Sequence, residues 1–340
     1  MSALRLIADD LTGALDSGCA FASPAEPVNV GLPGRPLPAG RRVAMSTETR
    51  DMSEQDAVRA AIDAVRAMRT CEPDTLWFKK IDSVMRGHPF AETKATFEAG
   101  RFSRCVFAPA YPAMGRITVN ATQYVAGKSV GPPFRDAFSQ VGLSVGAALS
   151  FIDADSQEVL RERVEHIPDP LNRTLWVGAG GLAAALAPVR SMISFPPVRG
   201  IVVGTSHPST KHQVESALST GNVHSHTPAG QSKDSDRVWL LSPGISSANA
   251  DETTSILHRD VPLIEMSAPD VTSIIVTGGE TLATVLDIVG ADFLECMGEA
   301  TTGVPVARVK GGRWNGVTLL SKSGGFGDAG LFARLIARSR

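Results

Sequence analysis

The sequence is poor in cysteine and contains no long apolar run. Its four cysteines, Cys19, Cys71, Cys105 and Cys296, lie far apart with no CxxC pair, which argues against a disulfide framework and a structural zinc site. The apolar stretches are broken by charges or glycines well short of the ~20 residues of a membrane-spanning helix. The first of them ends at Asp9 and is too short for the apolar region of a signal peptide. We therefore expect a cytoplasmic protein without a membrane partner.

An excess of charge of one sign is also missing. The 340 residues include 33 Lys and Arg against 35 Asp and Glu, a formal net charge of −2. Non-specific nucleic-acid binding needs a basic field, so we expect no nucleic-acid partner. The 43% hydrophobic and 20% charged residues are typical of a folded globular chain. At ~150 residues per domain, the length predicts about two domains.

Short apolar segments alternate with segments of helical spacing along most of the chain. This alternation predicts an α/β fold with mainly parallel sheets. Expected strands are 4–8, 43–46, 75–78, 104–108, 174–177, 200–203, 273–277 and 317–321, and expected helices include 13–21, 89–99, 209–219, 280–289 and 329–337. A further helix opens at a capping box formed by Ser53 and Asp56 and buries a stripe of Val58, Ile62, Val65 and Met68.

The segment 188–199 contains three prolines and little helical periodicity. We interpret it as a linker between a domain at 1–190 and a second α/β domain at 199–340. The polar stretch 221–237, which includes His224 and His226, is expected to be a loop, with the two histidines solvated rather than bound to a metal.

Four turns in the first half are rich in polar residues, and ligands of open α/β sheets bind beyond the carboxyl ends of the strands. Asp9 and Asp10 follow the first strand, where one of them could simply cap a helix. Arg50 could hold a carboxylate in a planar, two-bond contact, or pair on the surface with Asp51 or Glu48. The turn 79–88, with Lys79, Lys80, Asp82, Ser83 and Arg86, favours an anionic polar ligand. An irregular loop with two prolines, 109–116, ends in Arg116.

Three turns in the second half carry glycines between a strand and a helix. They are 202–207, 276–281 and 320–328, the last with Lys322. Glycines let backbone N–H groups approach phosphate oxygens, and a helix N-terminus adds favourable charge. Together these turns favour nucleotide phosphates over ordinary turns. Neither GxxxxGK[ST] nor GxGxxG occurs, and the absence of the latter disfavours a dehydrogenase.

Several motifs, in order along nearly the whole chain, resemble those of the four-carbon acid sugar kinases. They are ADDLTGALD (8–16), TETR (47–50), KKIDSVMRGH (79–88), APAYPAMGR (108–116), VGAGGLA (177–183), TGGET (277–281) and KSGGFGD (322–328). Departures from the family pattern are Val84, Met85 and His88 in the third motif and His207 in the first glycine turn. The chain is also shorter than the usual member after residue 127.

The resemblance implies ATP-dependent phosphorylation of a hydroxyl of threonate, erythronate or 3-oxo-tetronate, with the active site in the cleft between two domains and ATP and Mg²⁺ as cofactors. By position, the substrate residues are Asp9, Arg50, Lys80, Ile81, Asp82, Ser83 and Arg86, and the proton acceptor is Asp10 or Asp82. The nucleotide residues are Gly204, Thr205, Ser206, His207, Gly278, Gly279, Glu280, Thr281, Gly324 and Gly325. No protein metal ligand is assigned, and a homodimer is expected from the prevalence of symmetric oligomers.

Two other functions remain open at this point. The departures at Val84, Met85 and His88 fit a kinase for another small hydroxy acid. His207 and the missing length fit a sugar-acid-binding protein without catalysis.

Overall fold

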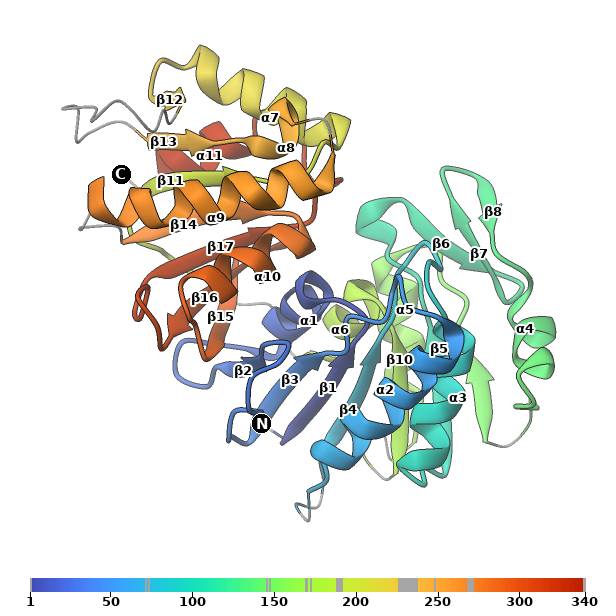
Figure 1. Cartoon of the computed structure of the whole chain (residues 1–340). Helices are drawn as coiled ribbons and strands as arrows, with labels where there is room; N and C mark the ends of the chain where they lie inside the picture. The colour runs from blue at the N-terminus through green and yellow to red at the C-terminus, as the bar shows by residue number, and fades with distance from the viewer. Residues whose placement is uncertain are drawn as a thin grey trace. The chain divides into compact units, whose positions relative to one another are not determined.

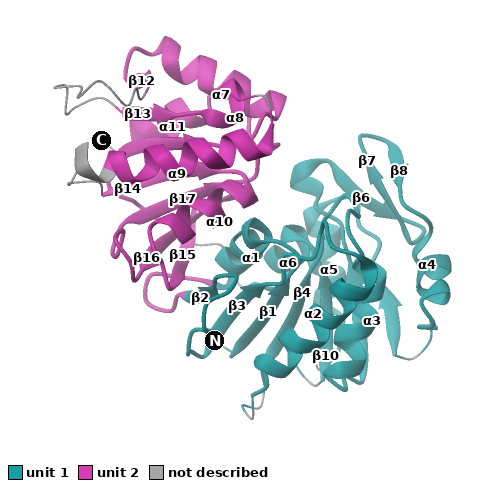
Figure 2. Cartoon of the chain, in the orientation of Figure 1, with its two compact units in different colours: residues 1–21, 28–190 teal, residues 22–27, 191–340 magenta. Residues whose placement is uncertain are grey.

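The computed structural model describes residues 2–70, 72, 74–144, 146, 148–168, 171, 173–187, 192–225, 238–247, 249–267 and 272–338. The chain divides into two compact units, unit 1 with residues 1–21 and 28–190 and unit 2 with residues 22–27 and 191–340 (Figure 2). The division falls in the segment 188–199 expected as a linker, of which residues 188–191 lie outside the described residues.

Unit 1 contains a parallel sheet with the strand order β2-β3-β1-β4-β10-β5-β9 (Figure 1). Its strands are β1 (Leu4–Ala8), β2 (Val28–Gly31), β3 (Arg42–Ser46), β4 (Leu76–Lys80), β5 (Arg104–Ala108), β9 (Leu149–Phe151) and β10 (Thr174–Gly178). Its helices are α1 (Leu11–Gly18), η1 (Cys19–Phe21), α2 (Glu54–Ala67), α3 (Pro89–Ala99), η2 (Pro112–Met114), α4 (Phe134–Gln140), α5 (Gln157–Glu165) and α6 (Gly180–Leu186). The expected α/β class is confirmed.

Helices cover both faces of this sheet, which is why strands such as β1 and β10 are buried along their whole length. On one face α2 packs on Ile7 and Val43, and α3 lies beside α2. On the other face α1 contacts β3, β1 and α6. Because side chains alternate between the faces of a strand, neighbouring residues of β4 point to different helices.

The α2 helix begins as expected, and its buried stripe shares only Val65 and Met68 with the expected one. The Ser53 side chain accepts a hydrogen bond from the Asp56 backbone N–H, as the capping box requires. Ala57, Ala61 and Ala64 are fully buried together with Val65 and Met68, whereas Val58 and Ile62 are only half-buried. The small alanine side chains let the helix lie close to the sheet and leave the larger residues at the edge of that contact.

The segment after β5 begins with the expected irregular loop, in which residues 112–114 form η2. After η2 it forms a small antiparallel sheet of β6 (Arg116–Val119), β7 (Thr122–Val125) and β8 (Lys128–Val130). The fully buried Gln123 side chain links this small sheet to the rest of unit 1. Its Nε2 donates to the backbone oxygens of Ser83 at 2.9 Å and Pro109 at 3.3 Å, and its Oε1 accepts from Thr118 Oγ1 at 2.7 Å.

Unit 2 has the strand order β12-β13-β11-β14-β17-β16-β15, parallel from β12 to β17 and antiparallel beyond. Its strands are β11 (Val198–Val203), β12 (Val223–Ser225), β13 (Val238–Leu241), β14 (Ser273–Thr277), β15 (Phe293–Thr301), β16 (Val304–Lys310) and β17 (Thr318–Lys322). Its helices are α7 (Pro208–Ser219), α8 (Pro243–Ser246), α9 (Ala250–Ser267), α10 (Gly279–Ile288) and α11 (Leu331–Arg338).

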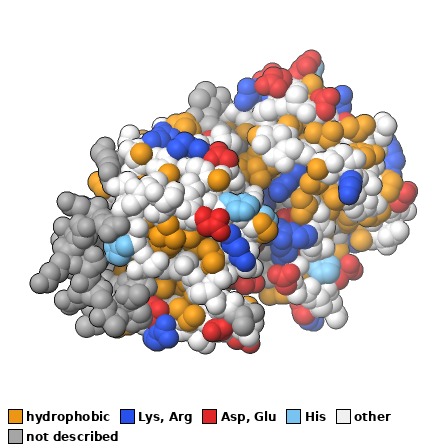
Figure 3. Space-filling view, turned by 90° about the horizontal axis from the view of Figure 1, so that it is seen from above, with side chains coloured by type: hydrophobic (Ala, Val, Ile, Leu, Met, Phe, Trp, Pro, Cys, Tyr) orange, Lys and Arg blue, Asp and Glu red, His pale blue; other side chains and the backbone are white. Residues whose placement is uncertain are grey.

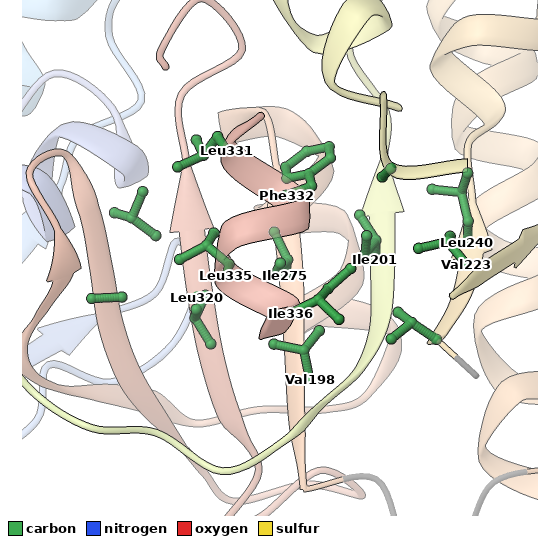
Figure 4. Close-up of a cluster of buried hydrophobic side chains, with 14 of the residues drawn as sticks. Val198, Ile201, Val223, Leu240, Ile275, Leu320, Leu331, Phe332, Leu335 and Ile336 are labelled. Carbon is green, nitrogen blue, oxygen red and sulfur yellow. The ribbon is translucent and has the colours of Figure 1, made fainter. Parts of the chain in front are cut away.

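The core of unit 2 lies between α11, α7 and the sheet (Figure 4). Leu331, Phe332 and Leu335 of α11 pack against strand residues such as Ile275 and Leu320. Four apolar side chains at i, i+1, i+4 and i+5 form the buried face of this helix. Ile193 and Phe195 also pack against this core, so residues 192–197 belong to unit 2 and are not part of a free linker.

One expected loop is partly a strand. Within the expected loop 221–237, residues 223–225 form β12, where His224 is half-buried, and residues 226–237 lie outside the described residues.

The structure also describes three of the four cysteines. Cys19, Cys105 and Cys296 are buried and free of disulfides, while Cys71 is outside the described residues. Among the described helices, none has the length and apolarity to cross a membrane. On the face shown in Figure 3, Lys and Arg side chains lie interspersed with Asp and Glu.

Candidate functional site

The polar turns of unit 1 meet where the order of its sheet reverses. β1 lies between β3 and β4, so the chain adds strands first on one side of β1 and then on the other. A crevice forms at the carboxyl ends of strands at such a switch point, and it is the usual ligand site of open α/β sheets. Asp9 and Asp10 follow β1, Arg50 lies beyond β3, and Asp82 lies beyond β4.

Arg50 joins these three turns. Its Nε and Nη2 donate to Asp9 Oδ2 at 3.1 and 3.0 Å, and its Nη1 donates to Asp10 Oδ2 at 3.0 Å. Its Nη2 also lies 2.9 Å from Asp10 Oδ1 and 3.7 Å from Asp82 Oδ1. The side chain of Arg50 is only 16% exposed, so this ion-pair cluster is largely shielded from water. The expected surface pairing of Arg50 with Asp51 or Glu48 does not occur.

Asp82 organises the turn in which it lies. Its Oδ2 accepts from the backbone N–H groups of Val84 and Arg86 at 3.1 and 3.2 Å, and both its oxygens accept from the Arg86 guanidinium. Burial alone would raise the pKa of Asp82, but the hydrogen bonds from Arg86 and the charge of Arg50 hold it well below its usual range. Asp82 is therefore a fixed carboxylate anchor.

The carboxyl groups of Asp9 and Asp10 have opposite pKa shifts. Burial raises the pKa of Asp9, and its Oδ1 is enclosed without a hydrogen-bond partner. Burial acts on Asp10 as well, but Arg50, Lys80 and a 2.6 Å hydrogen bond from Thr12 Oγ1 outweigh it and lower the pKa. Asp10 also caps α1 by accepting from the Gly13 N–H at 2.9 Å. Of this pair, Asp9 is the group closer to the protonation range of a general base.

The two lysines of the third motif point to opposite faces of β4. Lys79 is fully buried, and its Nζ donates to Glu92 Oε2 of α3 at 2.6 Å. Lys80 faces α1, where its Nζ lies 2.9 Å from the position that a Cβ on Gly13 would occupy. Only Lys80 thus reaches the acidic cluster. Gly13 is required there because a larger residue would displace Lys80 and overlap Asp10.

Ile81 and Ser83, the other residues expected to bind substrate, differ in what they can offer. The Ile81 side chain belongs to the apolar core around Phe107, which leaves it only backbone groups for a ligand. Ser83 is buried, and its Oγ accepts a hydrogen bond from Arg116 Nη1. Arg116 is a member of this site to which the sequence analysis assigned no role.

The three glycine turns of unit 2 converge at the carboxyl ends of β11, β14 and β17. A Cβ on Gly204 would overlap Thr281 Oγ1, and one on Gly324 would lie 2.8 Å from Thr205 Oγ1. Gly278 adopts a left-handed φ of 101° beside both threonines. These glycines thus let the turns pack closely against Thr205 and Thr281. Gly279, Glu280, Gly325, Ser206 and His207 lie on the same turns and are half-buried or exposed.

His207 replaces the small hydroxyl residue of the family pattern and takes over helix capping. Its Nδ1 accepts a hydrogen bond from the Ser209 N–H at 3.2 Å at the start of α7. Its Nε2 lies 3.1 Å from the position of a Cβ on Gly325. The imidazole thus borders the third turn, and the residue retains the local role of a cap.

Lys322 supports the third turn from inside. It is fully buried, and its Nζ donates to Thr210 Oγ1 and to the backbone oxygens of Ser323, Gly324 and Phe326 at 2.8–3.1 Å. The ammonium also lies 5.9 Å from the centre of the Phe332 ring. Lys322 therefore shapes the turn rather than extending into the nucleotide site.

Lys322 should make stability depend on pH. Burial lowers the pKa of Lys322 from 10.5 to about 7, so between these values the unfolded chain holds the proton and the folded chain does not. The free energy of unfolding should thus rise from pH 7 to pH 10, by at most about 1.4 kcal/mol per unit from this residue. Urea unfolding of the protein and of Lys322→Met across this range measures the difference. Equal slopes for both proteins would contradict this role.

A fourth turn borders the three glycine turns and was missed in the sequence. Ser242, Pro243 and Gly244 follow β13, the neighbour of β11. A Cβ on Gly244 would overlap the backbone of Gly204. The glycine directly after an apolar strand was the available signal. Among the described residues, no group of three or more His, Cys, Asp or Glu side chains could hold a metal ion.

Comparisons with known proteins match each unit separately. A family model described as a sugar-binding N-terminal domain matches residues 4–140, and one described as a nucleotide-binding C-terminal domain matches residues 245–332. The protein is thus of a two-domain class that pairs a sugar site with a nucleotide site.

Curated relatives indicate which enzymes within this class the chain resembles. The D-threonate kinase of Bordetella bronchiseptica is 26% identical over 97% of this chain and 96% of its own. That of Salmonella typhimurium is 24% identical over 95% of each chain. The D-erythronate kinase of Heliobacterium modesticaldum is 37% identical over 35% of this chain and 28% of its own. The chain belongs to the four-carbon acid sugar kinase family, which confirms the resemblance seen in the motifs.

Solved structures share the fold. A Salmonella typhimurium LT2 protein has a TM-score of 0.77 at 20% identity, covering 98% of both chains. A Haemophilus influenzae protein, assigned to a family of unknown function, has a TM-score of 0.72 at 17% identity, covering 99% of this chain and 100% of its own.

Proposed function

We propose that this protein transfers the γ-phosphoryl group of ATP to a hydroxyl of a four-carbon sugar acid of the threonate or erythronate type. The observation that carries the proposal is the buried cluster of Arg50, Asp9, Asp10 and Asp82 at the switch point of unit 1. It lies within the part of the chain that matches a sugar-binding domain. Full-length similarity to D-threonate kinases supports the reaction.

The residues of unit 1 hold and orient the acceptor. Carboxylate oxygens of the cluster accept hydrogen bonds from substrate hydroxyls, and Lys80 and Arg86 supply positive charge at its edge. The ion pairs with Arg50 fix the carboxylates before the substrate binds, which lowers the entropy cost of alignment. Ile81 contributes through its backbone, and Ser83 through its hydroxyl and backbone.

The attacking hydroxyl must lose its proton to a nearby base. Asp82 accepts four hydrogen bonds and has a lowered pKa, both of which weaken it as a base. The oxygens of Asp10 are occupied by Gly13, Thr12 and Arg50. Because Asp82 is the most heavily hydrogen-bonded of the three carboxylates, we place proton transfer on the Asp9–Asp10 pair rather than on Asp82.

The glycine turns of unit 2 suit a nucleotide. Gly204, Gly278, Gly324 and Gly325 let the turns pack closely against one another, and glycines at strand–helix turns allow backbone N–H groups to approach phosphate oxygens. Mg²⁺ would be held largely by the phosphates of ATP and by water and would neutralise phosphate charge, so a dedicated cluster of protein ligands is not required. The chemistry requires the γ-phosphate to reach the acceptor hydroxyl in line, with its developing charge neutralised.

Steady-state ADP release with a panel of four-carbon acids tests the proposal. D-threonate, L-threonate, D-erythronate and a 3-oxo-tetronate should be compared with three-carbon and five-carbon hydroxy acids, with and without Mg²⁺. We expect Mg²⁺-dependent ADP release with at least one four-carbon acid. Turnover only with another acid would support the alternative kinase. Acid binding without any ADP release would support the non-catalytic protein.

A further inference from the structure

Four cations surround the acidic cluster of unit 1, and two of them are already paired. Arg50 is bound to Asp9 and Asp10, and Arg86 is bound to Asp82. The remaining two are Lys80 and Arg116. Among the described residues, no carboxylate oxygen lies within 4.0 Å of a side-chain nitrogen of Lys80 or Arg116, so neither forms an ion pair. The charge at this site that remains available to an anionic ligand is therefore on Lys80 and Arg116.

The guanidinium of Arg116 has one edge without partners. Its Nη1 donates to Ser83 Oγ, whereas its Nε is buried and donates no hydrogen bond. Its Nη2, on the same edge as Nε, donates none to the described residues either. A carboxylate can bind the Nε and Nη2 groups of an arginine together, in a planar contact. Leaving a buried donor unsatisfied is costly, and because Nε itself is enclosed, a carboxylate bound at Nη2 removes this cost when the guanidinium turns toward it.

The fold holds Arg116 firmly at this place. It is the first residue of β6, and its backbone pairs with Tyr111 through hydrogen bonds of 2.8 and 3.2 Å. Gly115 makes the reversal possible with a left-handed φ of 65°. Gln123 ties the same small sheet to the backbone of Ser83. Backbone pairing with Tyr111 thus fixes Arg116, and the hydrogen bond from Gln123 fixes Ser83, so separate contacts hold the two residues in place.

We infer that Arg116, assisted by Lys80, binds the carboxylate of the sugar acid and so selects acids over neutral polyols. This inference rests on the proposed function and refines it. It assigns to Arg50 a different part from the carboxylate contact expected from the sequence, because contacts to Asp9 and Asp10 already occupy four of its five N–H donors. Arg50 instead holds the carboxylates that face the substrate hydroxyls.

The test compares an acid with a ligand of the same shape and no charge. The kinetic constants of the wild-type protein and of Arg116→Gln are measured with the best four-carbon acid and with its primary amide. We expect Arg116→Gln to raise KM for the acid roughly 10- to 100-fold, as for the loss of a charged hydrogen-bonded contact. KM for the amide and the affinity for ATP should stay nearly unchanged.

Two further variants complete the design. Arg116→Lys keeps the charge without the paired donors, so it should raise KM for the acid by less, and it serves as the measurement if Arg116→Gln does not fold. Lys128→Gln removes an exposed cation from β8 of the same small sheet and should change neither constant.

An equal rise of KM for acid and amide would overturn the inference and leave Arg116 as a support for Ser83. A fall in kcat alone would overturn it as well. Failure of the proposed function has a separate signature, which is the absence of ADP release by the wild-type protein with every acid.

Discussion

Replacing Arg50 with methionine is expected to lower the free energy of unfolding by about 3–5 kcal/mol and to abolish turnover. The variant leaves the carboxylates of Asp9 and Asp10, which are 5% and 15% exposed, without their shared cation. The loss should shrink as the pH falls, because protonation removes the uncompensated charges, beginning with Asp9, whose pKa burial raises. Urea unfolding at pH 5 and pH 8 measures both effects.

Arg86→Met is the matched control for this experiment. Arg86 is 63% exposed, and without it Asp82 keeps two backbone N–H donors and the charge of Arg50, so we expect a smaller loss than for Arg50→Met. The double variant Asp9→Asn with Arg50→Met should recover part of the stability lost in Arg50→Met. Equal losses for Arg50→Met and Arg86→Met would show that the cluster is not held by Arg50.

The adjacent lysines of β4 should separate stability from activity. Lys79→Met leaves Glu92, 1% exposed, as an unpaired buried carboxylate, so we expect a loss of about 3–5 kcal/mol with nearly normal kinetic constants below the melting temperature. Lys80→Met removes a buried cation whose charge lowers the pKa of Asp10. Some loss of stability should follow, but the main effect should be a more than tenfold rise in KM for the acid.

A double variant tests whether the unpaired charge of Glu92 causes the loss of stability in Lys79→Met. Lys79→Met combined with Glu92→Leu replaces the buried pair with apolar groups, and such replacements are often close to neutral. Its free energy of unfolding should therefore approach that of the wild-type protein. If Lys79→Met instead lowered activity without a loss of stability, the assignment of the two lysines to opposite faces would be wrong.

Much of the sheet was predictable because its strands are buried on both faces. Runs such as LRLIA at 4–8 and SIIVT at 273–277 are continuous and apolar, and the observed strands start and end where these runs do. The antiparallel strands β6–β8 and β15–β16 were not expected. Charged and polar residues occur along them, and their pairing depends on partners that local pattern does not reveal.

The candidate site was predictable as a set of turns but not as a set of contacts. Spacing along the chain located Asp9, Arg50 and Asp82 at strand ends. It could not show that Arg50 is neutralised by carboxylates from two other turns, because those contacts join residues about 40 positions apart. Nor could it show that Lys79 faces away from the site, since the face depends on the register of β4. A homodimer and a cytoplasmic location stay predictions.

The attachment of the small antiparallel sheet through Gln123 has a consequence for engineering. Residues 116–130 begin with Arg116 and form local backbone pairs. They join the rest of unit 1 through Gln123, the Thr118–Ala154 backbone bridge and the Ala121 N–H bond to Asp153. A segment attached at so few places can be transplanted between family members together with these partners. Preference among acceptors could then be retuned by grafting, with the phosphoryl-transfer machinery left intact.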